Sequence, residues 1–212
     1  FLPAINEDLA ATACLGTQRV ALDEQRTVDG VYAVWCGKGP GVDRSGDALK
    51  HGHVYGSSPL GGVLVVAGDD HGCVSSSMPH QSDLAMQAWS MPVLHPANVA
   101  EYLEFGLYGW ALSRATGAWV GFKAISEVVE SGMTVDLDAV PLDFTLPVDF
   151  VPPQPLHVRA VDLPSLALEE RLALKLDAVR AFARINSLDK HIVTSPRATL
   201  GIVTVGKAHF DF

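Results

Sequence analysis

The chain has 212 residues, of which 48% are hydrophobic, so it can bury a sizeable core. Its formal net charge is −9 and its basic residues form no cluster, which argues against binding to nucleic acid or to an anionic membrane. No apolar run approaches the roughly 20 residues of a membrane span, and the widely spaced cysteines without a C-x-x-C pair predict a cytoplasmic location.

The first predicted element is a helix that begins at Asn6. Asparagine is a favoured N-cap residue, and apolar residues recur at helical spacing from Leu9 onward. Glu7 and Asp8 suit the first turn, because carboxylates stabilise the positive end of a helix dipole. On this basis alone, Glu7 is most simply interpreted as a first-turn carboxylate.

A strand is predicted over residues 31–36, followed by the glycine-rich stretch 37–41. Glycine loops after strands can hold phosphate with their backbone N–H groups. However, the P-loop pattern is absent, and Val42 stands where a dinucleotide fingerprint needs its third glycine. We therefore expect a sharply turning loop whose backbone is approached closely by another group. Lys38 is either a ligand contact or a solvated side chain.

The densest polar cluster follows residues 63–67, a valine-rich run typical of a strand that is buried on both faces. Gly68 is predicted to end this strand. Residues 69–71 would then lie at its carboxyl end, where open α/β sheets bind their ligands. A solvated turn is the simpler alternative. A metal site that combines His71 and His80 with Asp69 or Asp70 is a weaker one, because no H-x-x-x-H spacing is present.

Alternating elements continue along the chain. The patterns predict a helix that contains residues 84–89, a strand at 91–94, a helix from 98 to about 116, a strand at 119–123 and a short helix at 125–131. Such alternation is typical of a doubly wound, mostly parallel α/β sheet.

The helix that begins after Asn98 has two notable features. Glu101 lies three residues beyond Asn98, which is a capping-box spacing. Gly106 and Gly109 each weaken a helix by about 1 kcal/mol, so we expect close packing to offset that loss. The predicted buried face consists of Val99, Leu103, Gly106 and Trp110.

The character of the chain then changes. Prolines concentrated in 139–164 predict a surface segment without a long helix or a central strand. An amphipathic helix is predicted over 166–185, and a strand over 200–205 would begin a second α/β unit. The predicted buried stripe of the amphipathic helix consists of Leu168, Leu172, Leu176, Val179 and Phe182.

Five stretches resemble a known family. They are Asn6–Ala13, Gly37–Asp47, Gly68–His71, His80–Ser82 and Trp119–Lys123. In this order they resemble the large, fused indolepyruvate ferredoxin oxidoreductases, within the 2-oxoacid:ferredoxin oxidoreductase family.

The resemblance implies a division of the chain into three parts. Residues 1–135 resemble a thiamine diphosphate-binding PYR-type domain whose first strand would lie before Phe1. Residues 136–195 would form a proline-rich connection and a helix. Residues 196–212 would be the truncated start of a transketolase C-terminal-like domain. We therefore expect the sequence to be an internal segment of a larger protein.

The resemblance also implies a reaction. A 2-oxoacid such as indolepyruvate would be oxidatively decarboxylated on thiamine diphosphate to an acyl-CoA, with electrons passing through iron–sulfur clusters to ferredoxin. Mg²⁺ and the [4Fe-4S] clusters would be bound by other parts of the full protein, so the segment alone is expected to be inactive. The expected partners are the oxoacid, coenzyme A, ferredoxin, the remaining domains and a second copy in a homodimer. Pyruvate and branched-chain oxoacids stay open as substrates.

The resemblance assigns roles to individual residues. Glu7 would be the carboxylate that hydrogen-bonds the pyrimidine ring of the cofactor, and would be both catalytic and cofactor-binding. His80 aligns roughly with an arginine that binds the substrate carboxylate in pyruvate-using relatives, and His71 is a second candidate. A neutral histidine is a weaker carboxylate partner than a bidentate arginine, which fits a different, bulkier substrate. The residues placed beside the cofactor are Gly37, Lys38 and Gly39.

Two other functions compete with this one. A non-catalytic structural or interaction module could keep the PYR-type fold without its chemistry. A nicotinamide-dependent Rossmann enzyme is also conceivable, although the incomplete glycine pattern argues against it. A measurement of NAD binding would separate the latter from the thiamine enzyme.

Overall fold

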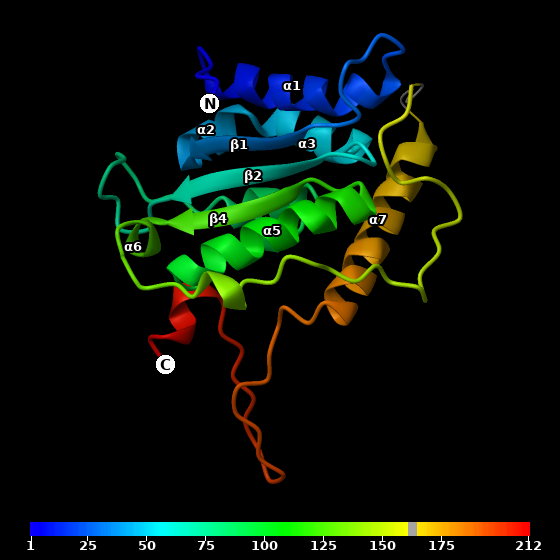
Figure 1. Cartoon of the computed structure of the whole chain (residues 1–212). Coiled ribbons are helices and arrows are strands. Elements are labelled where there is room, and N and C mark those ends of the chain that lie inside the picture. Colours follow the sequence, from blue (N-terminus) through cyan, green and yellow to red (C-terminus); the bar gives the residue numbers. More distant parts are fainter. Residues whose placement is uncertain (161–164) are drawn as a thin grey trace.

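The computed structural model describes residues 1–160 and 165–212. Its centre is a four-stranded, all-parallel sheet with the strand order β1-β2-β4-β3 (Figure 1). The predicted α/β class and the parallel sheet are thereby confirmed. The strands are β1 (Tyr32–Lys38), β2 (Gly62–Asp69), β3 (Val93–Leu94) and β4 (Val120–Ile125).

Helices cover both faces of this sheet, as expected of a doubly wound fold. One face packs against α1 (Glu7–Gln18), α2 (Gly39–Arg44), α3 (Gly46–Tyr55) and α4 (Asp83–Ala88). The other face packs against α5 (Val99–Thr116) and the last turns of α7 (Leu166–Ile185). Shorter elements are η1 (Arg19–Leu22), α6 (Ser126–Val129), η2 (Leu137–Ala139) and η3 (Gly206–His209).

The central strand β2 is buried on both faces, as its apolar sequence predicts. Val63, Val65 and Ala67 belong to the core under α1–α4, whereas Leu64 belongs to the core under α5. The predicted strand end at Gly68 is wrong, because the ladder with β4 continues to Asp69. Asp69 is therefore held in the sheet itself and does not lie in a solvated turn.

Both predicted asparagine caps are confirmed. The Asn6 Oδ1 atom accepts a hydrogen bond from the Leu9 N–H at 2.9 Å, and Asn98 Oδ1 accepts one from the Glu101 N–H at 3.1 Å. The Glu101 carboxylate reaches back to the Ala97 N–H at 2.6 Å, one residue before the cap. These bonds satisfy N–H groups that a helix start leaves without partners.

The predicted buried face of α5 is wrong. The helix instead buries Tyr108, Leu112 and Thr116, while Leu103 is exposed. Close packing holds for Gly109, where a Cβ atom would lie 2.6 Å from the Leu64 side chain. It fails for Gly106, where a Cβ atom would meet nothing within 4 Å. The prediction fails because α5 is apolar around most of its circumference, so the spacing of its apolar residues does not identify the buried face.

Helix α7 has the predicted bounds, and none of the five residues of its predicted stripe is exposed. Only Phe182 of that stripe is fully buried, however, and the helix also buries Arg171 and Lys175 at 0% exposure. Lys175 Nζ donates to the carbonyls of His53 at 2.9 Å and Val54 at 2.7 Å. These carbonyls lie in the last turn of α3, whose negative dipole end attracts cations.

The end of the chain also departs from expectation. Residues 140–160 contain no helix or strand, as the prolines predict, whereas residues 161–164 lie outside the described part of the chain. The predicted strand at 200–205 is wrong, because these residues pair with no strand and Val203 is 91% exposed. The proposed start of a second α/β unit and the domain boundaries stay predictions. Among the described residues, no helix has both the length and the apolar composition needed to cross a membrane.

The two glycines of α5 provide a matched test of packing. Gly106→Ala should raise the free energy of unfolding by about 0.5–1 kcal/mol, because alanine is the better helix former and the space is open. Gly109→Ala should be less stable than Gly106→Ala by about 1–3 kcal/mol, because Leu64 and Leu94 must move. Urea denaturation of both variants measures the difference. Equal stabilities would contradict the packing described for Gly109.

The buried His53 predicts how stability depends on pH. Burial, and then the charge of Lys175, lower the pKa of His53 to about 3. The folded state therefore holds a neutral imidazole, whereas the unfolded chain takes up a proton below its ordinary value near 6.5. The free energy of unfolding should be highest above pH 6.5 and fall by a few kcal/mol as the pH drops toward 3. Each unit of difference between the folded and unfolded pKa of His53 is worth about 1.4 kcal/mol.

Urea denaturation between pH 7.5 and pH 4.5 measures this dependence. A His53→Gln variant should lose less stability over that interval than the wild type, whereas His51→Gln, which alters an exposed side chain, should keep the wild-type decline. An unchanged decline in His53→Gln would assign the effect to other groups, of which His95 and His157 also have a pKa lowered by burial.

Candidate functional site

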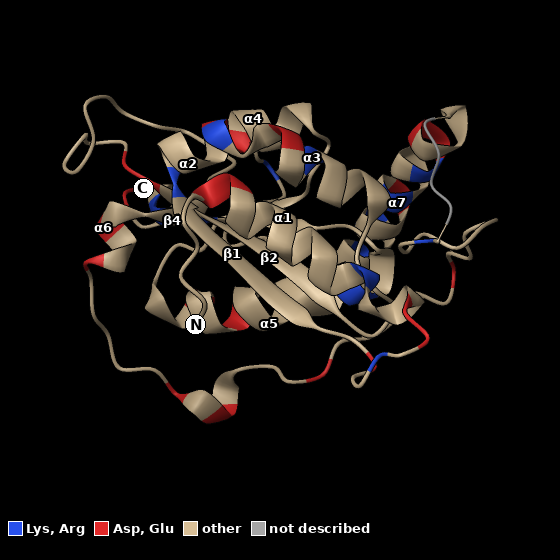
Figure 2. Cartoon of the chain, turned by 90° about the horizontal axis from the view of Figure 1, so that it is seen from above, with Lys and Arg blue, Asp and Glu red and all other residues tan. Residues whose placement is uncertain are grey.

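The candidate site lies at the carboxyl end of the parallel sheet. The carboxyl ends of β1, β2 and β4 lie side by side, because the strands are parallel and in register. Helix α1 begins at the same end, and Figure 2 shows its acidic first turn next to α2. The fold thus collects residues from distant parts of the sequence at one edge.

The glycine-rich stretch is not the loop that the sequence predicts. Strand β1 continues to Lys38, and α2 begins directly at Gly39. A Cβ atom at Gly39 would lie 2.3 Å from the His80 side chain, and one at Gly41 would lie 2.7 Å from Cγ of Glu7. Both glycines are therefore required so that Glu7 and His80 can pack against the first turn of α2.

Trp35 joins this turn to the start of α1. Its indole Nε1 donates a 2.9 Å hydrogen bond to the backbone carbonyl of Glu7. Its fully buried ring lies where a Cβ atom of Gly37 would be, at 2.7 Å. A single tryptophan therefore fixes the position of Glu7 relative to the end of β1. The predicted residues Glu7, Gly37, Gly39 and His80 are brought together.

The side chain of Lys38 already has a hydrogen-bond partner outside the group formed by Glu7, Gly37, Gly39 and His80. Its Nζ donates to the carbonyl of Ser75 at 2.8 Å. Asp70 shapes the same loop by accepting hydrogen bonds from the N–H groups of Ser75 at 2.6 Å and Val74 at 2.9 Å. These bonds hold the pKa of Asp70 below its ordinary value. Lys38 thus anchors the loop that follows β2.

His80 already has partners. Its Nε2 lies 3.5 Å from the carboxylate of Asp43 on α2, and its Nδ1 lies 3.2 Å from the carbonyl of Met78. The imidazole is largely buried, whereas the Asp43 carboxylate is mostly exposed. His80 therefore lies at the predicted place, but a substrate carboxylate would have to compete with Asp43 for it.

A second group, at the ends of β2 and β4, was not assigned from the sequence. Lys123 is almost fully buried, and its Nζ donates to Asp83 at 2.6 Å and lies 3.6 Å from Asp69. Asp69 also accepts hydrogen bonds from the N–H and the hydroxyl of Ser82, at 2.8 and 2.6 Å. Burial alone would raise the pKa of Asp83, but the hydrogen bond and charge of Lys123 lower it.

His71 interacts electrostatically with His95, a histidine near this second group. Its charge influences the pKa of His95, which follows β3 directly. Burial, and then the charge of Lys123, lower the pKa of His95, so its imidazole is neutral near pH 7. Within the described part of the chain, the buried Nε2 atoms of both histidines have no hydrogen-bond partner. The structure thus separates the two histidines that the sequence grouped together.

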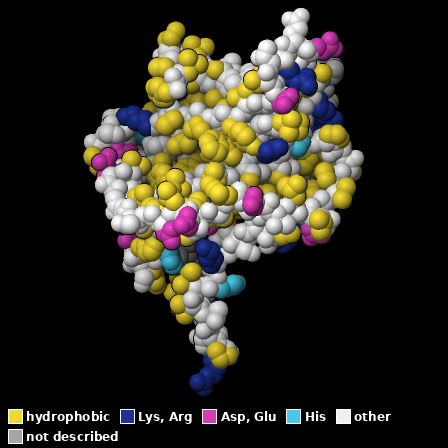
Figure 3. All heavy atoms as spheres, viewed as in Figure 1, with side chains coloured by type: hydrophobic (Ala, Val, Ile, Leu, Met, Phe, Trp, Pro, Cys, Tyr) yellow, Lys and Arg dark blue, Asp and Glu magenta, His cyan; other side chains and the backbone are white. Residues whose placement is uncertain are grey.

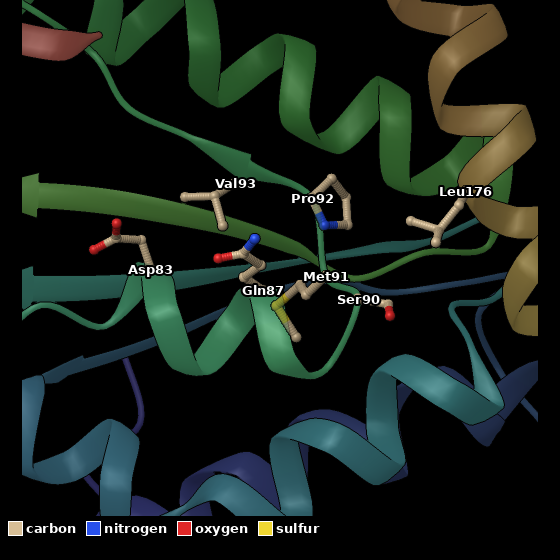
Figure 4. A pocket seen from close by; sticks show the side chains of 7 residues that line it. All are labelled: Asp83, Gln87, Ser90, Met91, Pro92, Val93 and Leu176. Carbon is tan, nitrogen blue, oxygen red and sulfur yellow. The ribbon is translucent and has the colours of Figure 1, made fainter.

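A hollow lies beside this second group. It measures about 440 Å³ and runs between α4, the segment that leads into β3, and Leu176 of α7. Figure 4 shows Asp83 and Gln87 on one of its sides and Pro92 on another. It contains none of the residues predicted for the site.

The residues that sequence reasoning missed have recognisable signals. Lys123 is a cation at the end of an apolar strand, and His95 is the first polar residue after β3. Both positions are carboxyl ends of strands, which is the rule that singled out residues 69–71. Over 1–160 and 165–212, no group of three or more His, Cys, Asp or Glu residues could hold a metal ion. The alternative of a metal site at His71 and His80 therefore finds no support.

Comparisons with protein-family models, with curated proteins and with solved structures give no match.

The ion pair of Lys123 gives a test of the second group. In Lys123→Met, burial acts on Asp83 without a compensating cation, so the pKa of Asp83 should rise. The free energy of unfolding should fall by about 2–3 kcal/mol, because the buried Asp69 loses its nearest positive charge. Carboxyl-carbon NMR titration and urea denaturation measure the two effects. Lys50→Met, which removes an exposed lysine of α3, is the control. An unchanged Asp83 pKa would contradict the described pair.

Proposed function

We propose that the chain is the PYR-type segment of a thiamine diphosphate-dependent 2-oxoacid:ferredoxin oxidoreductase. The observation that carries this proposal is the position of Glu7. Its half-buried carboxyl side chain lies in the first turn of α1, packed against Gly41 at the carboxyl end of the sheet. In the described residues, no side chain or backbone group donates a hydrogen bond to this carboxylate.

These features fit the role that the resemblance implies. A carboxylate that is held in place by its backbone, through Trp35, keeps its oxygens available for a ligand. Thiamine diphosphate, when bound, supplies the electron sink for decarboxylation of a 2-oxoacid. Glu7 would hold a proton at the pyrimidine ring, and the ends of β1 and α2 would line the same place. The diphosphate, Mg²⁺ and the [4Fe-4S] clusters would be held by other parts of the full protein.

The position of β1 at the edge of the sheet supports a PYR-type fold. In the described residues β1 pairs with β2 alone, and α1 packs on the same face of the sheet as α2 and α3. Because parallel crossovers share one hand, a strand that leads into α1 would lie beyond β1. On the opposite face Tyr32 and Val34 are 47% and 49% exposed, and Figure 3 shows hydrophobic side chains gathered there. A first strand before Phe1, with its own helix, would cover this surface.

The substrate class follows from His80. Its ring already lies next to the Asp43 carboxylate and lacks the bidentate geometry of an arginine, which disfavours a small acid that is held mainly by its carboxylate. We therefore propose an arylpyruvate such as indolepyruvate, with pyruvate and branched-chain oxoacids as the alternatives. Coenzyme A, ferredoxin, the remaining domains and a second copy in a homodimer are the proposed partners, in the cytoplasm.

One observation favours a second candidate, a non-catalytic module with the same fold. At Gly37, Gly39 and Gly41, other side chains of the same chain occupy the space where a Cβ atom would lie. The glycines then serve packing alone, and no ligand is needed to explain them. A nicotinamide enzyme gains no comparable support.

Viologen reduction by the parent polypeptide tests the proposed function. The protein is supplied anaerobically with thiamine diphosphate, Mg²⁺ and coenzyme A, and receives indolepyruvate, phenylpyruvate or pyruvate in turn. We expect reduction that is fastest with an arylpyruvate. Glu7→Gln should lower the rate by at least about 100-fold, because the acid–base function of the carboxylate is lost. Asp8→Asn, in the same helical turn, should retain most of the activity.

The result also decides between the two candidates. No reduction with any of the three acids, from protein with its clusters and cofactor loaded, would favour the non-catalytic module. Equal losses in Glu7→Gln and Asp8→Asn would show that the helix start, and not the Glu7 carboxylate, is what matters.

A further inference from the structure

The last residues of the chain return to the carboxyl end of the sheet. After α7, residues 190–203 are exposed throughout, and Figure 1 shows them projecting away from the body. The chain then comes back, and η3 lies near α6 and the start of α5. In this returning segment Gly206 is buried, Thr204, Lys207 and His209 are half-buried, and Val205 and Ala208 are exposed.

Gly206 packs directly on His95. A Cβ atom at Gly206 would lie 2.5–2.6 Å from three atoms of the imidazole ring, so no other residue fits without displacement. The backbone of Gly206 also has a φ angle of +59°, which glycine adopts at little cost. The backbone of Gly206 thus packs over the imidazole ring of His95.

In this closed arrangement a buried polar atom lacks a hydrogen-bond partner, and few interactions hold η3 in place. The buried Nε2 atom of His95 has no hydrogen-bond partner among the described residues, and an unpaired buried polar atom destabilises the state that buries it. The polar contacts of η3 are local, between Lys207 and Asp211 and between His209 and Thr204. A segment with few buried groups opens at low cost. Opening would let water or a ligand reach Nε2.

We propose that residues 206–209 are a lid over the second polar group, formed by His71, His95, Asp69, Asp83 and Lys123. Opening of the lid exposes the His95 imidazole, next to the Lys123 ion pair, to a small hydrogen-bonding ligand. The lid rests on the packing of Gly206 against His95 and does not depend on the proposed function.

Chemical modification of histidine by diethyl pyrocarbonate tests the lid on the chain as it stands, with mass spectrometry of peptides to follow each residue. In the wild type, His95 should react more slowly than the exposed His51. Gly206→Val should speed the reaction of His95 by at least about ten-fold, because the larger side chain holds the lid open. Gly201→Val is the matched control, since a Cβ atom there meets nothing within 4 Å.

The fully buried His53 reports whether the variant is still folded, and it should stay unreactive in both variants. An unchanged rate at His95 in a folded Gly206→Val protein would overturn the lid. Amide hydrogen exchange of the wild type gives a second measurement that needs no variant. Residues 206–209 should exchange much faster than β2, and exchange as slow as that of β2 would also overturn the proposal. Both measurements are independent of catalysis, so the lid and the proposed function can fail separately.

Discussion

The burial of β2 on both faces is the constraint on which the rest of the structure depends. A strand with Val63 and Val65 under one helical layer and Leu64 under the other leaves no room for chemistry on the faces of the sheet. Polar groups can then gather only at the strand ends. The amino end is covered by α7, whose buried cations bind the last carbonyls of α3. The carboxyl end is left as the place where polar side chains from separate strands meet.

Close contact at glycine organises that end in two places. The absence of a Cβ atom at Gly39 and Gly41 lets His80 and Glu7 pack against the first turn of α2. The same absence at Gly206 lets the end of the chain pack against the ring of His95. In each case a missing Cβ lets two segments that are distant in sequence approach within van der Waals contact. The sequence suggests that the backbone near residue 39 is approached closely. It does not reveal the approaching group, because that group comes from a different element.

Local signals predicted the elements of this fold better than the contacts between them. The caps at Asn6 and Asn98 and the bounds of α7 followed from short-range preferences, and the structure has them. The burial of Lys175 did not follow, because it depends on the α3 carbonyls that accept the hydrogen bonds of its Nζ atom. The β-rich run at 200–205 formed no strand, because strand preference has no effect without a neighbouring edge. In the site, Glu7 and His80 both pack against the first turn of α2, whereas His71 interacts electrostatically with His95.

The two polar groups at the carboxyl end differ in how their charges are paired. Around Lys123 one buried cation lies between two carboxylates, and burial lowers the pKa of the neighbouring His95. The carboxylates of this group are therefore already engaged with a cation that belongs to the chain itself. Around Glu7 the carboxylate has no described cation as a partner, and only its backbone is fixed. A group that must exchange a proton with a ligand needs this freedom, so under the proposed function acid–base chemistry would fall to the group around Glu7.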